Sequence, residues 1–300
     1  MTIRRTTLTA AVLLALTAVA ACNDGDAQSA PPPASASATV SASATASVTP
    51  TATAAVPTPT ATVTATPTAT PTPTVTGAPV DASGAFDPAV ALANADRTPY
   101  AATETMKTTA TADGQGSVIT QTGRVNFNTP TRECRIETKM TIGDESDEPT
   151  LWMESISTGK ATFMRNKAKP GSAWSSSDTD SDDAAQADDR TVYAKALVEA
   201  GPAARKGMEQ KNGVPAYHLG ARLTAAQLKA IDPKDYKRMA DQGVTAKDYD
   251  VWIDRAGRVL AEKQSMKVPK GGTTVTSVIT VAYTDFGPRE TFTVPTAAAS

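Results

Sequence analysis

Apolar and polar side chains alternate along residues 132–142, the most regular pattern in the chain. The apolar set is Cys134, Ile136, Thr138, Met140 and Ile142, and the polar set is Glu133, Arg135, Glu137 and Lys139. Alternation along the strand predicts an antiparallel strand with one buried face and one wet face. Residues 117–127 have a similar pattern and are predicted to pair with this strand across a turn at 128–131.

The same reasoning predicts the remaining elements. Strands are predicted at 103–111, 150–157, 160–166, 214–222, 249–254, 258–267 and 273–284, with a short edge piece at 291–294. Helices are predicted at 88–95, at 190–210 with an interruption at Gly201-Pro202, and over 224–241, and a charged loop is predicted at 175–189. This order predicts an α+β fold, in which an antiparallel sheet packs against helices on one of its faces.

Two local signals support this assignment. Asp87 followed by Pro88 is typical of a helix start, with the aspartate as N-cap and the proline at the first helical position. The stretch 254–257 ends in a glycine that can adopt a positive φ, so it predicts a hairpin turn between two strands.

The N-terminus has the organisation of an export signal. Arg4 and Arg5 precede an uncharged, Leu- and Ala-rich stretch that is too short for an ordinary membrane-spanning helix. It ends in Val19-Ala20-Ala21-Cys22, which resembles a bacterial lipobox. We therefore expect residues 1–21 to be a lipoprotein signal peptide and Cys22 to carry the acyl chains. The alternative is an ordinary secretory signal with a cysteine nearby.

A long tether is expected to follow the signal peptide. No charged residue occurs between Asp26 and Asp81, and the segment consists almost entirely of Ala, Ser, Thr, Val and Pro. Such a composition cannot bury enough apolar surface to offset the entropy of ordering. The sequence thus predicts a lipidated N-terminus and disordered tether at 22–85 and one β-rich domain at 86–300.

Charge and cysteine content exclude several classes of function. The net charge of −2, with 29 basic and 31 acidic residues, disfavours a nucleic-acid partner, which would require clustered basic charge. Cys22 and Cys134 are the two cysteines, so acylation of Cys22 leaves Cys134 without a disulfide partner. We expect a protein held to the extracytoplasmic face of the cell membrane by its lipid, with a domain stabilised by packing.

The C-terminal half resembles a known family. The run Tyr249-Asp-Val-Trp-Ile-Asp-Arg-Ala-Gly-Arg258 is similar to a hairpin of actinobacterial LppX/LprG-type lipoproteins, and Val281-Ala-Tyr-Thr-Asp-Phe-Gly287 is similar to their final strand. The resemblance covers roughly Asp87–Pro295 and extends more distantly to the LolA/LolB carriers. It implies a curved antiparallel half-barrel over helices, enclosing an apolar cavity for the acyl chains of a lipid or glycolipid.

The matching motifs are turns and strand ends, so they transfer no ligand residues. The inward side chains of the predicted strands are the candidates for a ligand-binding site, although the pattern does not separate cavity positions from core positions. These candidates are Ile136, Met140, Ile142, Trp252, Val275, Ile279 and Val281.

Other chemical signals favour structural roles. The acidic run from Asp178 to Asp189 has the ligand spacing of a calcium loop, but it lacks the glycine and the final glutamate of that motif, which favours a solvated loop that caps a helix. The single histidine, His218, lacks a nucleophile motif and the ligands for zinc. We expect Cys134 to be a buried thiol, and we predict no metal, no cofactor and no catalytic residue.

Two functions remain open at this level. The first is non-catalytic binding or transfer of a lipid or another hydrophobic ligand in the half-barrel cavity. The alternative is a tethered sensor or scaffold module that binds an envelope protein and has a core filled by its own side chains. A continuous apolar cavity of about 300 Å³ between sheet and helices would favour the first, and a large exposed apolar patch would favour the second.

Overall fold

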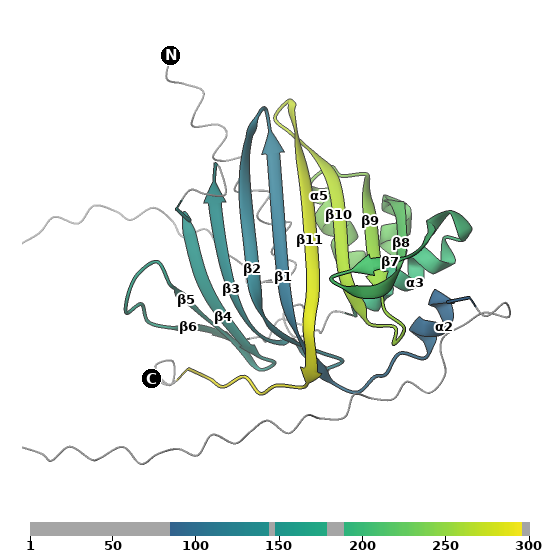
Figure 1. Cartoon of the computed structure of the whole chain (residues 1–300). Coiled ribbons are helices and arrows are strands. Elements are labelled where there is room, and N and C mark those ends of the chain that lie inside the picture. Colours follow the sequence, from purple (N-terminus) through teal and green to yellow (C-terminus); the bar gives the residue numbers. More distant parts are fainter. Residues whose placement is uncertain (1–84, 144–147, 179–188, 296–300) are drawn as a thin grey trace, which may run out of the picture. The chain divides into compact units, whose positions relative to one another are not determined.

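The computed structural model describes residues 85–143, 148–178 and 189–295 (Figure 1). The predicted signal peptide, Cys22 and nearly all of the predicted tether therefore lie outside the described residues, as does the acidic stretch 179–188.

A single antiparallel sheet of 11 strands forms most of the domain. Its order is β6-β5-β4-β3-β2-β1-β11-β10-β9-β8-β7, so β6 and β7 are its two edges and the sheet is open. The strands are β1 (Tyr100–Ala112), β2 (Gln115–Phe127), β3 (Glu133–Ile142), β4 (Leu151–Thr158), β5 (Ala161–Asn166), β6 (Ser175–Asp178), β7 (Arg205–Lys211), β8 (Val214–Thr224), β9 (Ala246–Ile253), β10 (Val259–Lys270) and β11 (Thr273–Pro288). The predicted open antiparallel sheet is confirmed.

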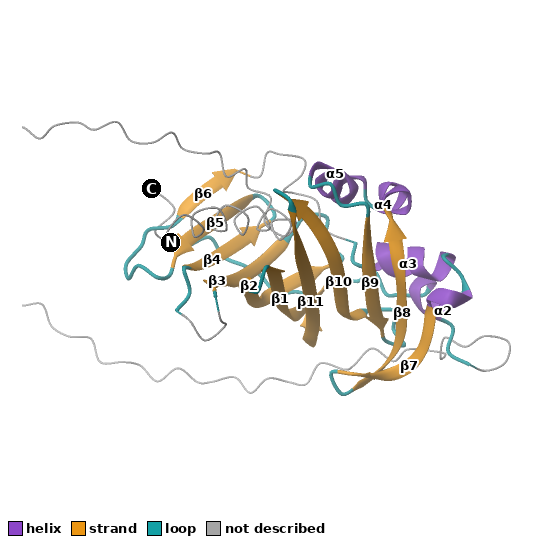
Figure 2. Ribbon diagram, turned by 90° about the horizontal axis from the view of Figure 1, so that it is seen from above, coloured by secondary structure: helices purple, strands orange, loops and turns teal. Residues whose placement is uncertain are grey.

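The α-helices of the described residues, four in number, lie toward one end of this sheet (Figure 2). They are α2 (Pro88–Ala93), α3 (Thr191–Glu199), α4 (Ala225–Ile231) and α5 (Pro233–Asp241), and a short 3₁₀ turn, Pro202–Ala204, follows α3. Helix α3 packs on β8 and β9, and α4 packs on β8. Within the described ranges, no helix has the length and apolarity needed to cross a membrane.

The helix starts follow from capping chemistry. Asp87 accepts a hydrogen bond from the Ala89 backbone N–H at the start of α2, as predicted. Thr224 and Gln227 form a reciprocal capping box at the start of α4, which satisfies two backbone donors that the helix itself leaves unpaired. The predicted helical region 224–241 is therefore two helices, and Asp232 both ends α4 and caps α5.

Strand register assigns every side chain to one of two faces. We call the face that carries the helices the inner face, and the other the outer face. The inner face holds Leu219, Val251 and Tyr249 beneath the helices, and the ring of Tyr249 stacks on Tyr193 of α3 at 4.5 Å. One large hydrophobic core runs along this inner face from β8 to β3.

Three predicted elements are wrong. The charged loop expected at 175–189 begins instead with the edge strand β6, Ser175–Asp178, which pairs with β5. Residues 205–210 were expected to continue a helix, but they form the edge strand β7, paired with β8. The piece 291–294 was expected to be an edge strand and is not one. Strand β11, which precedes it, is already paired on both sides, with β1 and β10. Side-chain bonds from Arg289 to Glu133 and from Arg124 to Glu290 hold the residues that follow β11.

Candidate functional site

Five of the predicted ligand-binding residues lie together on the inner face. Ile136 and Met140 come from β3, and Val275, Ile279 and Val281 come from β11; all five are buried. Strands β1 and β2 lie between β3 and β11, and their inner-face side chains complete the stripe. Those contributions are Ala102, Met106, Ala110, Ile119, Val125 and Phe127.

The other two predicted residues lie elsewhere. Ile142 is on the inner face but at the end of β3, where 37% of it is exposed. Trp252 is on the outer face, in a small separate cluster with Ala216, Leu260 and Ala261. Its ring stacks on His218 at 4.5 Å, and its indole N–H donates to Glu209. The structure therefore does not bring Trp252 into one site with the other candidates.

The apolar stripe extends well beyond the helices. Figures 1 and 2 show α3, α4 and α5 over the β7–β10 side of the sheet, whereas β1, β2, β3 and β11 continue past them. Side chains of a sheet face that a helix covers are usually apolar, because they are buried. The helices account for such side chains at β8 and β9. The buried apolar stripe on β1–β3 and β11 therefore extends beyond the strands that α3 and α4 contact.

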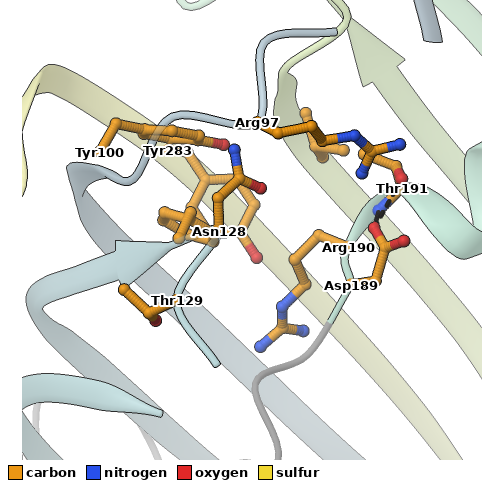
Figure 3. Close-up of a pocket in the computed structure, with 10 residues that line it drawn as sticks. Arg97, Tyr100, Asn128, Thr129, Asp189, Arg190, Thr191 and Tyr283 are labelled. Carbon is orange, nitrogen blue, oxygen red and sulfur yellow. Dashed lines mark hydrogen bonds between the residues drawn. The ribbon is translucent and has the colours of Figure 1, made fainter. Parts of the chain in front are cut away.

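A cavity of about 270 Å³ opens at one end of this stripe (Figure 3). Its floor is aromatic: Phe127 lies in edge contact with Tyr283 and stacks on Tyr100. Its rim is polar and comes from the segment before β1, the turn after β2 and the start of α3. The rim residues are Arg97, Asn128, Thr129, Asp189, Arg190 and Thr191.

The rim carries more positive than negative charge. Figure 3 shows Arg97 and Arg190 reaching the cavity from two separate segments of the chain. The Asp189 carboxylate accepts from the backbone N–H of Thr191 at 2.9 Å and from the Lys195 ammonium at 3.2 Å, so it is engaged in capping α3. On the floor, burial raises the pKa of Tyr100 to about 12, so its phenol is neutral at physiological pH.

Neither this cavity nor the second hollow of the domain is the continuous apolar cavity of about 300 Å³ that would favour lipid binding. The cavity at the end of the stripe has six polar or charged residues among its ten lining residues, not counting two tyrosines. A second hollow of about 360 Å³ is lined largely by polar residues of β9, β10 and β11, among them Asp248 and Lys267. The apolar surface is the sheet face itself, and the first cavity lies at its end.

Glu104 was missed as a site residue by the sequence reasoning. It lies on the inner face of β1, in phase with Ala102, Met106 and Ala110, and is 2% exposed. The signal was present in the sequence, because a glutamate that shares the alternation of apolar residues is expected to be buried with them. Its importance depends on partners across the sheet, which only the register identifies.

The remaining sequence signals resolve as structural features. Cys134 is buried on the inner face of β3, as predicted, and burial raises the pKa of its thiol. His218 is on the outer face of β8, bonded to Asp250 at 2.8 Å, so Cys134 and His218 cannot share a metal. Within the described ranges, no group of three or more His, Cys, Asp or Glu residues gathers in a geometry that holds a metal ion.

Comparison with known proteins returns structural similarity alone. The sequence matches no protein-family profile and no curated protein. The fold is similar to LprF from Mycobacterium bovis, with a TM-score of 0.35 and 14% identity over 71% of this chain and 97% of that one. It is also similar to the lipoprotein LppX from Mycobacterium tuberculosis, with a TM-score of 0.32 and 13% identity over 64% of this chain and 88% of that one.

A third similar structure is a DUF1329 family protein from Desulfovibrio piger, with a TM-score of 0.19 and 12% identity over 67% of this chain and 90% of that one. The two mycobacterial lipoproteins belong to the group that the sequence resembles. At such low scores the similarity carries no ligand and no binding residue across, so the function has to be argued from the site itself.

Proposed function

We propose that this chain is a lipid-anchored protein of the extracytoplasmic face of the cell membrane, and that its domain binds a lipid without catalysing a reaction. The acyl part of the lipid lies along the inner face of β1, β2, β3 and β11. The polar part lies in the cavity bounded by Tyr100, Tyr283, Arg97 and Arg190.

One observation carries this proposal: the buried apolar side chains on the inner face of β1–β3 and β11 extend beyond the part of the sheet on which the helices pack. An acyl chain that leaves water for this face is stabilised by about 25 cal/mol per Å² of its own apolar surface. An acyl chain is a suitable partner because it needs no directional contacts. The aromatic floor and the arginine rim at the end of the face then suit the junction between an acyl chain and a polar headgroup.

The alternative, a module that binds an envelope protein, has less support. It requires a contiguous exposed apolar patch. Among the described residues, the large apolar side chains that are exposed are scattered over β3, β7, β8 and the C-terminal segment. They are Ile142, Met208, Val214 and Val294.

Two neighbouring residues of β11 provide a matched test of lipid binding. Ile279 points to the inner face, and Val278 points to the outer face. We expect Ile279→Trp to reduce the lipid that copurifies with the full chain from its host, because the indole fills space that the acyl chain uses. Val278→Trp should leave the lipid content unchanged. Lipid is measured by native mass spectrometry and by analysis of an organic extract.

Stability separates this outcome from a filled core. Overpacking a filled core costs about 1–3 kcal/mol. If Ile279→Trp loses that much stability and the protein without substitutions carries no lipid, lipid binding is contradicted. The anchor has its own test. On detergent phase separation, the native protein without substitutions should enter the detergent phase, and the peptide that contains Cys22 should carry acyl chains. An unmodified Cys22 thiol in the native protein would refute the anchor and leave the binding proposal standing.

A further inference from the structure

Three buried polar side chains on the inner face have oxygen atoms that lack a hydrogen-bond partner within the described chain. They are both carboxyl oxygens of Glu104, the hydroxyl of Thr108 and the side-chain oxygen of Gln121. The three residues are 2%, 3% and 5% exposed, respectively. Because buried polar groups in folded proteins are nearly always paired, three such groups in one patch call for a partner from outside the chain.

Strand register places Gln121 next to both Glu104 and Thr108, which are four residues apart on β1. Gln121 of β2 lies directly opposite Met106 of β1, so it is the diagonal neighbour of both Glu104 and Thr108 on the same face. Diagonal neighbours across an antiparallel pair are within reach of long side chains. The amide nitrogen of Gln121 donates to the Thr138 hydroxyl at 3.2 Å, which orients the amide and leaves its oxygen as an acceptor.

Glu104 faces no side chain directly opposite on β2, where the backbone of β3 comes close to the chain. Its direct neighbour there is Gly123, which has no side chain. Its neighbour on the other side is Tyr283, which forms part of the cavity wall and donates its hydroxyl to Glu262 at 3.3 Å. Glu104 therefore lies beside the cavity wall, and Gln121 and Thr108 lie further along the apolar face.

We infer that the bound lipid carries free hydroxyl groups, one of which donates a hydrogen bond to Glu104 while another donates to Gln121 and accepts one from Thr108. This inference rests on the proposed function and specifies its ligand class: an acylated polyol of the monoacylglycerol type. An acyl methyl ester has no donor and would leave the acceptors unpaired. A fatty-acid carboxylate would place acceptors against acceptors.

Competition between two probes of equal chain length tests the inference. The full chain in mild detergent is incubated with equimolar 1-monopalmitoylglycerol and methyl palmitate, and native mass spectrometry measures the two complexes. We expect the unmodified chain to prefer monopalmitoylglycerol by about tenfold or more, since an unpaired buried polar group costs about that much affinity. In Glu104→Leu the preference should fall close to equality, with methyl palmitate still bound.

Glu262→Gln is the matched control, because Glu262 is a buried glutamate of the same face whose oxygens already accept from Tyr249 and Tyr283. It should keep the preference for monopalmitoylglycerol. The ligand-free Glu104→Leu protein should unfold at the same temperature as the unmodified chain, or at a higher one. A marked fall in that temperature would show that Glu104 has a partner within the chain and would overturn the inference.

The outcomes distinguish the inference from the function on which it rests. Equal binding of both probes by the unmodified chain, or a preference that survives in Glu104→Leu, would refute the hydroxyl-bearing ligand while leaving lipid binding intact. Binding of neither probe would contradict lipid binding itself.

Discussion

The buried pair between Lys247 and Asp235 is expected to be the most sensitive electrostatic contact in the domain. Lys247 of β9 is 1% exposed and Asp235 of α5 is 4% exposed, so the pair joins the helices to the inner face of the sheet. Tyr193 donates to the same carboxylate at 2.7 Å, and Lys247 also donates to the Gln264 side chain at 3.1 Å. Burial opposes charging of Asp235, but Lys247 and then Arg238 hold its pKa below the usual value.

Replacing Lys247 by methionine removes the ammonium and leaves Asp235 buried. Breaking a buried ion pair from one side costs about 3–5 kcal/mol. Because Arg238 and Tyr193 still contact the carboxylate, we expect the lower part of this range, about 3 kcal/mol. Adding Asp235→Asn to Lys247→Met should cost clearly less than the sum of the two single changes, by about 1–3 kcal/mol.

Urea unfolding followed by tryptophan fluorescence measures these differences. Arg222→Met is the control, since Arg222 pairs with Asp248 on the surface, where the two side chains are 66% and 54% exposed. An exposed pair of this kind contributes about 0–1 kcal/mol. If Lys247→Met costs no more than Arg222→Met, or if the double change costs the full sum, the reasoning about this buried pair is wrong.

Three further predictions test other parts of the structure. Gly123→Ala should destabilise the domain strongly, because an added Cβ would come within 3.0 Å of three backbone atoms of β3. Gly213→Ala is the control: its Cβ would meet open space, so it should cost only about 1 kcal/mol in urea unfolding. Burial disfavours the charge of Glu154, but bonds from two arginines lower its pKa overall. Glu154 thus adds its full contribution to the stability of the fold above its pKa in the unfolded chain, and this contribution is lost as pH falls through its lower pKa in the folded protein. In an acid titration, Glu154→Gln should therefore make the free energy of unfolding less dependent on pH below about 4.5. The Cys134 thiol should resist a thiol reagent at pH 8 in the folded protein and react on unfolding, and fast labelling of the native protein would contradict its burial.

The sequence predicts correctly those elements that depend on residues close together in the chain. Strand β3 is the clearest example, because its alternation over 133–142 matches the observed faces, and the turn before it brings β2 alongside as expected. Helix α2 is similar, since its cap is a local interaction between Asp87 and the next turn. Local chemistry suffices where an element depends on neighbours in the chain.

Prediction fails where pairing decides the structure. The sequence Arg-Lys-Gly-Met-Glu-Gln-Lys of 205–211 contains no β-branched residue, and it becomes strand β7 because β8 offers it an unpaired edge. Residues 291–294 contain Thr, Phe and Val but do not form a strand, because the strand before them has no free side. Local preference is overruled in both segments by the availability of a partner.

The candidate site was predictable in part for the same reason. Alternation alone identifies Ile136, Met140, Ile279 and Val281 as inward residues. It does not show that β11, which is distant in sequence, pairs with β1, nor that Gln121 and Glu104 become diagonal neighbours. Trp252 has the period of its strand but faces outward, because the inner face of β9 is occupied by Val251 and Ile253.

Photochemical crosslinking tests most directly whether the inner face binds an acyl chain. A monoacylglycerol with a diazirine near the middle of its chain is bound to the full protein and irradiated, and the labelled residues are mapped by peptide mass spectrometry. We predict adducts on the inner-face residues of β1, β2, β3 and β11, such as Met106, Ile119 and Ile279. Adducts confined to outer-face residues such as Val278, or no adduct at all, would contradict lipid binding on this face.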